Sequence, residues 1–352
     1  MAAIKPDSAF AAMAGRHGGD LATARRLFPD APAPWLELST GINPVPYPVG
    51  AISTGAFTAL PAPAEQAALE AAAAKAWGVV DAASVVAAPG TQAILQHLPM
   101  LIPARSVGVL GFTYSGHAAA WSGAGRHISE VEKVEDLADF DVAVVVNPNN
   151  PDGRIVSLRV LTGLAAKMAD NGSVLIVDEA FVEASLGARS LAPFVKNCGA
   201  LVLRSFGKIH GLAGLRLGFA VAPLPLAARL RQSLGSWAVS GPALEIGARA
   251  LADTGWIAEA RLRLAADCER LDKMLRGARF EIVGGALLFR LARHPGAAAR
   301  FEALCRLGVL TRPFASKPDL LRFGLPGTPA AWERLEAALA EVCRAMPGSH
   351  PG

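Results

Sequence analysis

A short stretch near the middle of the chain brings together a lysine, a serine, two arginines and four glycines. It runs from Arg204 to Gly218. Lys208 lies three residues after Ser205 and eight before Arg216. Arginine and serine donate hydrogen bonds to phosphate oxygens, and glycine allows the backbone to approach a ligand closely. A lysine among cations and apolar side chains loses its proton more readily and can form a Schiff base.

A phosphate beside a Schiff-base lysine is the combination that pyridoxal 5′-phosphate (PLP) requires. The alternative is a surface turn with solvated charges, because a single Ser-x-x-Lys is a weak signal on its own. Other parts of a PLP site follow in a sensible order along the chain, and together they favour the PLP interpretation.

Two further segments carry groups that a phosphorylated ring would need. Gly90-Thr91 opens an apolar helical pattern, where unpaired N–H groups and the helix dipole favour a phosphate, although Thr91 is also an ordinary N-cap. Asp178 follows the apolar run 173–177. A carboxylate at the end of a buried strand needs a partner, and a protonated pyridine nitrogen would serve. The alternative is a helix N-cap.

Two loops follow other predicted strands. Tyr114 comes after the strand 107–112 and could stack on a flat ring, or it could be a core or rim tyrosine. Asn147-Pro-Asn-Asn-Pro-Asp-Gly153 follows the apolar run 140–146. This turn-rich loop would lie at the carboxyl edge of a parallel sheet, where open α/β sheets bind ligands.

The elements that must position these residues alternate between strand and helix from about 80 to 222, which predicts a mostly parallel sheet with helices on both faces. The remaining chain predicts a smaller α+β domain, with one long helix over 243–276, strands over 280–283, 286–290, 308–314 and 319–324, and helices over 297–307 and 330–346. We therefore expect an arm and part of the small domain over 1–45, a large PLP-binding domain over 46–235 and a small C-terminal domain over 236–352.

Several residues outside the large domain could contact a substrate. Arg312 and Arg322 lie on neighbouring short strands, where they would form a clamp for a doubly anionic molecule, or they are surface charges. His17 precedes a glycine pair in the arm, and an exposed histidine is the simpler interpretation there. Gly41 could offer its backbone N–H to a carboxylate or form a plain turn.

Composition limits the classes of function. The 352 residues are 52% hydrophobic and 18% charged, which indicates a globular chain. A net charge of +4 without a dense basic run argues against nucleic-acid binding. The four cysteines are far apart, so neither a metal site nor a disulfide framework is expected. The N-terminus lacks an apolar signal core and no run is long enough for a membrane span, so we expect a cytoplasmic protein.

In combination, three motifs resemble the fold-type I PLP enzymes of the class I/II aminotransferase family: Asn147–Pro151, Asp178–Phe181, and Ser205 with Lys208 and Arg216. Within that family the chain is most similar to the L-threonine-O-3-phosphate decarboxylases of cobalamin biosynthesis. The segments that favour this resemblance are His17-Gly-Gly, Ser39-Thr-Gly-Ile-Asn-Pro44, Trp237-Ala-Val-Ser240, and Phe181 where histidinol-phosphate aminotransferases usually carry tyrosine.

The resemblance implies a role for each matching residue. For the cofactor, Lys208 would bind PLP covalently, Asp178 would pair with the ring nitrogen, Asn150 would bond the ring oxygen, Tyr114 would stack on the ring, and Gly90, Thr91, Ser205 and Arg216 would hold the phosphate. For the substrate, Arg322 would bind the carboxylate with Gly41 nearby, and His17 and Arg312 would bind the phosphate. Gly18 and Asn150 would also contact the substrate.

The resemblance also implies a reaction, the decarboxylation of L-threonine O-3-phosphate to (R)-1-amino-2-propanol O-2-phosphate by a homodimer. Two alternatives stay open at this point. One is an aminotransferase such as histidinol-phosphate aminotransferase, which would use nearly the same residues. The other is a non-catalytic PLP-binding module. Two departures from the family pattern are Leu60, in place of a tyrosine that reaches the neighbouring subunit's cofactor, and Asp152, which adds negative charge near the site.

Overall fold

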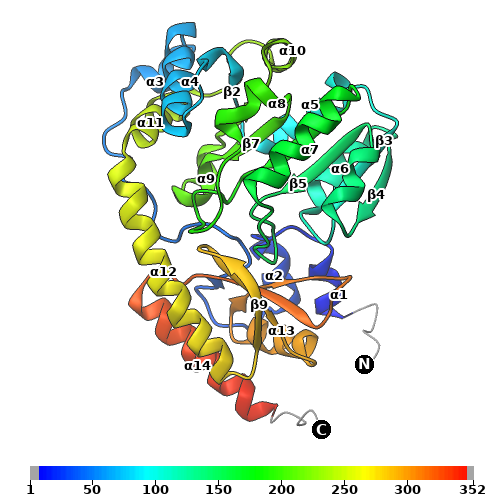
Figure 1. Cartoon of the computed structure of the whole chain (residues 1–352). Coiled ribbons are helices and arrows are strands. Elements are labelled where there is room, and N and C mark those ends of the chain that lie inside the picture. Colours follow the sequence, from blue (N-terminus) through cyan, green and yellow to red (C-terminus); the bar gives the residue numbers. More distant parts are fainter. Residues whose placement is uncertain (1–7, 347–352) are drawn as a thin grey trace. The chain divides into compact units, whose positions relative to one another are not determined.

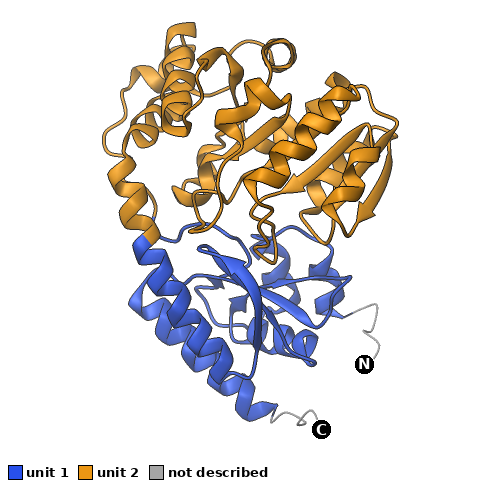
Figure 2. Cartoon of the chain, in the orientation of Figure 1, with its two compact units in different colours: residues 1–45, 262–352 blue, residues 46–261 orange. Residues whose placement is uncertain are grey.

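The computed structural model describes residues 8–346. The chain forms two compact units, shown in Figure 2. Unit 1 comprises residues 1–45 and 262–352, and unit 2 comprises residues 46–261. Unit 2 therefore extends to Arg261, beyond the domain boundary expected at 235, and the expected domain division stays a prediction.

A seven-stranded sheet forms the centre of unit 2 (Figure 1). Its strand order is β2-β8-β7-β6-β5-β3-β4. Every neighbouring pair is parallel except the two that involve β8, which runs antiparallel to both β2 and β7. The strands are β2 (Val85–Ala88), β3 (Ser106–Leu110), β4 (His127–Val131), β5 (Val142–Val146), β6 (Val174–Asp178), β7 (Leu201–Ser205) and β8 (Gly218–Val221).

Helices cover both faces of this sheet because side chains of its inner strands alternate between two apolar clusters. On β5, Ala143 and Val145 pack in one cluster, whereas Val142 and Val144 pack in the other. The first cluster includes α4 (Pro63–Trp77), α7 (Leu158–Asp170) and α11 (Gly241–Ala252). The second includes α5 (Thr91–Leu101), α6 (Ser115–Gly123) and α10 (Leu224–Leu234). The predicted mostly parallel sheet with helices on both faces is confirmed.

The edge strand β4 was not expected from the sequence. Three of its five residues, His127, Ser129 and Glu130, are polar, and none of the five is fully buried. Short elements connect the main ones: α3 (Gly55–Thr58), α8 (Val195–Cys198), α9 (Phe206–Ile209), and the 3₁₀ turns η1 (Ala82–Ser84), η2 (Val134–Asp139), η3 (Ala192–Phe194) and η4 (Ala213–Leu215).

Unit 1 is built on an antiparallel sheet of order β12-β13-β10-β9 and a separate parallel pair, β1 with β11. The apolar interior includes Phe301, Phe323 and Leu335, all completely buried. Its elements are α1 (Ala9–Ala14), α2 (Leu21–Leu27), β1 (Leu36–Glu37), β9 (Glu281–Ala286), β10 (Phe289–Arg293), α13 (Ala297–Arg306), β11 (Val309–Leu310), β12 (Arg312–Pro313), β13 (Leu320–Gly324) and α14 (Pro329–Ala345).

Two expected elements are wrong in detail. The single helix over 243–276 is two helices, α11 and α12 (Thr254–Gly277). Asp253 separates them with a non-helical backbone, and its Oδ1 accepts a hydrogen bond from Trp256 N at 3.0 Å, as an N-cap does. The single strand over 308–314 is β11 and β12, which belong to different sheets. Within residues 8–346, no helix combines the length and apolarity that crossing a membrane demands.

Candidate active site

The topology of unit 2 brings the predicted cofactor residues to one edge of the sheet. Strands β2, β5, β6 and β7 run in the same direction, so their carboxyl ends lie at the same edge. Strand β8 runs the opposite way and therefore begins there. As a result, Gly90, Asp178 and Ser205, which follow or end their strands, share this edge with Arg216, which precedes β8.

Gly90, Thr91 and Arg216 form a compact cradle. Gly90 has a φ of +86°, and Thr91 is the first residue of α5. A Cβ atom at Gly90 would lie 2.8 Å from Arg216 Nη2, so the guanidinium group lies directly beside this glycine. A Cβ at Gly218 would lie 2.3 Å from Thr91 N, so only glycine fits where β8 begins. The cradle combines the free N–H groups of a helix terminus with a cation.

Asp178 ends the central strand β6 and is buried, with 6% of its surface exposed. His117 Nε2, on α6, lies 2.8 Å from Asp178 Oδ2 and donates to it, since a carboxylate oxygen can only accept. Asp178 Oδ1 accepts from Ala180 N at 3.0 Å. His117 is completely buried, and its Nδ1 has no hydrogen-bond partner within the described chain. His117 was not predicted from the sequence; the available signal was a histidine in a first helical turn whose other residues are small and uncharged.

Lys208 lies on the single turn α9 directly after β7. Its Nζ is 5.6 Å from the centroid of the Phe181 ring, three residues after Asp178. A Cβ at Gly207 would lie 2.7 Å from the Cα of Ala213, so the chain before Lys208 packs closely against the following turn. The structure thus places Lys208 and the segment of Asp178 on the same part of unit 2.

Tyr114 and the loop of Asn150 lie at the ends of neighbouring strands, β3 and β5. The Tyr114 hydroxyl donates to Gln92 Oε1 at 3.1 Å, and its ring meets that of His117 edge-on at 6.0 Å between centroids. Tyr114 therefore lies between the first turn of α5 and the partner of Asp178.

The structure gives Asp152 a local role. Its Oδ1 accepts from Asn149 Nδ2 at 2.7 Å and from Arg154 N at 2.9 Å. Asn149 Oδ1 in turn accepts from Thr113 Oγ1 at 2.5 Å. These bonds fix the turn that contains Asn150, so Asp152 is a turn residue of the kind that bonds the backbone two positions later.

Arg204, in the stretch around Lys208, takes a structural role. Its Nη1 donates to Glu179 Oε2 at 3.0 Å and its Nη2 forms an ion pair with Glu183. Burial raises the pKa of Glu179, and the Arg204 charge opposes that shift. Consecutive residues of an extended chain point to opposite sides, so Glu179 is directed to this ion pair while Asp178 is directed to His117.

In unit 1, the two predicted arginines lie directly opposite each other. Arg312 on β12 pairs with Arg322 on β13 in the strand register. Arg322 is buried, its Nη2 donates to Ser39 O at 2.5 Å, and its guanidinium carbon lies 5.1 Å from the Phe289 ring centroid. Burial and the charge of Arg312 lower the pKa of Arg322, whereas Glu37 raises it. An anion is the ligand that such a pair of cations favours.

The segments of His17 and Gly41 meet the same part of unit 1. Gly19 N donates to Ser39 Oγ at 2.7 Å, and a Cβ at Gly18 would lie 2.5 Å from Ser39 O. Gly41 is buried two residues after Ser39, and the side chain of His17 is exposed. The structure therefore brings the His17–Gly19 segment, the Ser39–Gly41 segment and Arg322 together.

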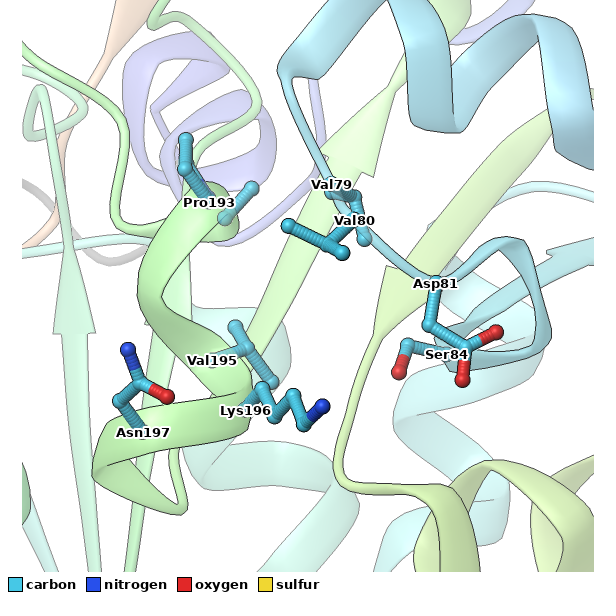
Figure 3. A pocket seen from close by; sticks show the side chains of 9 residues that line it. Val79, Val80, Asp81, Ser84, Pro193, Val195, Lys196 and Asn197 are labelled. Atoms are coloured by element: carbon cyan, nitrogen blue, oxygen red, sulfur yellow. The ribbon is translucent and has the colours of Figure 1, made fainter.

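A small pocket of about 60 Å³ lies elsewhere in unit 2 (Figure 3). In the liquid, one water molecule takes up about 30 Å³, whereas sites that bind small molecules have volumes of roughly 300–1,000 Å³. This pocket is therefore too small for a metabolite. None of the predicted site residues lines it. The lining residues are Val79, Val80, Asp81, Ser84, Ala192, Pro193, Val195, Lys196 and Asn197.

Comparisons with known proteins identify the family. The sequence profile of aminotransferase class I and II matches residues 41–339. A threonine-phosphate decarboxylase of Pseudomonas aeruginosa is 43% identical over 92% of this chain and 96% of its own length. Another threonine-phosphate decarboxylase, of Sinorhizobium sp., is 41% identical over 93% of this chain and 98% of its own length.

Among solved structures, the histidinol-phosphate aminotransferase of Sinorhizobium meliloti in complex with pyridoxal-5′-phosphate superposes with a TM-score of 0.83 at 20% identity. The match covers 98% of this chain and 99% of that one. At this identity the likeness shows the fold alone, and it agrees with the predicted fold type I. By the extent of the profile match and the identity to its relatives, the chain belongs to the aminotransferase class I and II family.

Proposed function

We propose that this protein is a PLP-dependent decarboxylase that converts L-threonine O-3-phosphate to (R)-1-amino-2-propanol O-2-phosphate and CO₂, a step of cobalamin biosynthesis. The observation that carries the proposal is the 43% identity to a threonine-phosphate decarboxylase along 92% of this chain. A match over 92% of the chain covers most of unit 1 and most of unit 2.

The donor groups of unit 2 fit PLP. The cradle of Gly90, Thr91 and Arg216 offers a helix N-terminus and a guanidinium group, which are the groups that bind phosphate. Ser205, at the end of β7, adds a hydroxyl at the same edge. We assign the cofactor phosphate to these four residues. Gly218 supports the assignment because it allows β8 to begin against the cradle.

Asp178, Lys208, Asn150 and Tyr114 would hold the ring. Asp178 is buried and held by His117, so it can pair with a protonated ring nitrogen without turning away. We assign the covalent link to Lys208 Nζ, the ring oxygen to Asn150 and ring stacking to Tyr114. His117 acts through Asp178 as a positioning residue.

When bound, PLP supplies an electron sink for the electron pair that the departing carboxylate leaves on Cα. The chain's own residues orient the substrate and move the proton. We assign to Lys208 Nζ the delivery of a proton to Cα after the bond between Cα and the carboxylate carbon breaks. The overall reaction balances, since one solvent proton replaces the carboxylate that leaves as CO₂.

The anionic groups of the substrate would bind to unit 1. We assign the substrate carboxylate to Arg322, with the Gly41 backbone nearby, and the phosphate to Arg312, His17 and Gly18. Asn150 is a further proposed substrate contact. The opposed register of the two arginines supports a ligand with two anionic groups, because each guanidinium group can bind one of them. We also propose that the enzyme is a cytoplasmic homodimer, in which the contact that Leu60 cannot make is either missing or supplied by another group.

The experiment that tests this function measures CO₂ release and amine transfer side by side. Purified protein loaded with PLP is incubated with L-threonine O-3-phosphate alone, and separately with histidinol phosphate and 2-oxoglutarate. We expect CO₂ from the first mixture and no glutamate from the second. Glutamate without CO₂ would assign the protein to the aminotransferases, and no turnover in either mixture would support the non-catalytic alternative.

A further inference from the structure

Glu37, the last residue of β1, bonds to both residues that lead into the Gly41 segment. Its Oε1 accepts from Ser39 N at 2.6 Å and also from the Ser39 hydroxyl. Its Oε2 accepts from Thr40 Oγ1 at 2.6 Å. The Glu37 carboxylate therefore accepts three hydrogen bonds from two consecutive residues. The proposed reaction assigns no role to Glu37.

The bond to Glu37 determines what the Ser39 hydroxyl can do for the arm. A hydroxyl has one proton, and Ser39 gives that proton to Glu37, which leaves its oxygen as an acceptor. Gly19 N donates to this oxygen at 2.7 Å. Ser39 is only 2% exposed, so a lost partner would not be replaced by bulk water. The carboxylate thus orients the group that fixes the backbone beside His17.

Ser39 also holds Arg322, through a different atom. Its carbonyl oxygen accepts from Arg322 Nη2 at 2.5 Å. Glu37 acts on the same arginine through its charge, raising the pKa of Arg322 where burial and Arg312 lower it. The segment is fixed further to β13, because Gly324 N donates to Leu38 O at 2.7 Å.

We propose that Glu37 is a positioning residue for the anionic substrate: it orients Ser39, and Ser39 holds both the Gly18–Gly19 backbone and Arg322. The inference rests on the proposed function, in which these groups bind phosphate and carboxylate. It predicts that affinity for a phosphorylated ligand depends on a carboxylate that does not touch the ligand, and that the dependence passes through the hydroxyl of Ser39 and not that of Thr40.

Ser39 and Thr40 provide a matched pair of variants. Ser39→Ala and Thr40→Val each remove one hydroxyl that donates to Glu37, but only the Ser39 hydroxyl accepts from Gly19. In the PLP-loaded protein we expect Ser39→Ala to raise the dissociation constant of inorganic phosphate and the KM for L-threonine O-3-phosphate about fivefold, the effect of one hydrogen bond, with kcat unchanged. Thr40→Val should change neither.

Amide hydrogen exchange gives a readout that does not depend on turnover. The exchange of a peptide spanning residues 15–20 should become faster in Ser39→Ala, because Gly19 N loses its acceptor, and should stay at the wild-type rate in Thr40→Val. Equal exchange and equal phosphate affinity in the two variants would overturn the inference.

Substitution of Glu37 itself completes the test. Glu37→Ala loses all three hydrogen bonds, and we expect it to raise KM at least tenfold. Glu37→Gln keeps an acceptor for Ser39 and a group that can bond Thr40, so we expect a smaller rise in KM. If Glu37→Ala does not fold, the comparison of Ser39→Ala with Thr40→Val still tests the inference. Absence of CO₂ release by the wild type would contradict the proposed function, whereas exchange at Gly19 and phosphate affinity would still test Glu37.

Discussion

The predicted cofactor residues of unit 2 and the predicted anion-binding residues of unit 1 are assembled in different ways. In unit 2 each residue follows, ends or precedes a strand of one sheet, and the strand direction alone brings them to one edge. In unit 1 the contact between Ser39 and Arg322 joins residues 283 positions apart. The cofactor residues thus depend on one continuous segment, and the substrate residues on both ends of the chain.

This contrast predicts which kind of substitution affects which step. Changes in unit 2 should reduce turnover of every substrate, because the cofactor acts on all of them. Changes to the residues of unit 1 that are assigned to the phosphate should distinguish a phosphorylated substrate from an unphosphorylated one, because only the phosphorylated substrate has that group.

The largest effect is expected at Lys208. Lys208→Ala should abolish turnover and the visible absorbance of covalently bound cofactor, while the far-UV circular dichroism spectrum stays that of the wild type. Lys196→Ala is the matched control, since Lys196 lines the separate pocket of Figure 3. Measurable turnover in Lys208→Ala would contradict the assignment of the covalent link and of proton delivery to Lys208.

Substitution of Asp178 tests the second cofactor contact. Asp178→Asn should lower kcat/KM on the order of 1,000-fold, because the charge that pairs with the ring nitrogen is lost. His117→Ala should lower it about tenfold by freeing Asp178, and His97→Ala, on α5, serves as control. Both losses should be equal for phosphorylated and unphosphorylated threonine. A loss confined to the phosphorylated substrate would contradict the division between the units.

Arg312 should show the opposite behaviour. Arg312→Met should raise the KM for L-threonine O-3-phosphate about 10- to 100-fold and that for L-threonine little, since a charge-assisted bond to phosphate is lost. Arg293→Met, on β10 of the same sheet, is the control because Arg293 pairs with Asp319 and Glu281. Steady-state kinetics with both substrates measures the difference; equal losses would remove the phosphate role of Arg312.

The smallest effect concerns stability rather than chemistry. His210 is buried, stacked on Phe206 with 4.1 Å between centroids, and burial lowers its pKa below 6.5. The unfolded chain therefore binds a proton that the folded chain resists, so stability is lost as the pH falls below about 6.5. Urea unfolding measures the free energy of unfolding at pH 7.5 and at pH 5.5. The decrease in this free energy between the two pH values should be about 1 kcal/mol smaller in His210→Phe than in the wild type. Unchanged pH dependence would contradict this, and His127→Gln is the exposed control.

The sequence predicted unit 2 well because its signals are local. Apolar runs such as 140–146 are characteristic of buried parallel strands, and the residues that follow them must lie at the carboxyl edge. His117 was missed because its contact with Asp178 depends on how α6 packs on the sheet, which no short motif records. Asp152 was unexplained for a similar reason, since its partner Asn149 is apparent only when the turn is seen.

Unit 1 was predicted less completely. The arginines on β12 and β13 were recognised from their strands, but nothing near Glu37 in the sequence indicates that Ser39 contacts Gly19 and Arg322. The break between α11 and α12 at Asp253 was missed because the apolar pattern continues across it. Contacts between distant segments come from the topology, and a single sequence does not specify them.

The most direct test of the central claim follows the carboxylate carbon of the substrate. The wild-type enzyme is given L-threonine O-3-phosphate labelled with ¹³C at the carboxylate, in D₂O, and both products are analysed by mass spectrometry. The account predicts one labelled CO₂ for each amine phosphate formed, with one deuterium at the former Cα. If the ¹³C label stays in a 2-oxo acid and the amino group is transferred to an acceptor, the protein is an aminotransferase and the proposed decarboxylation is wrong.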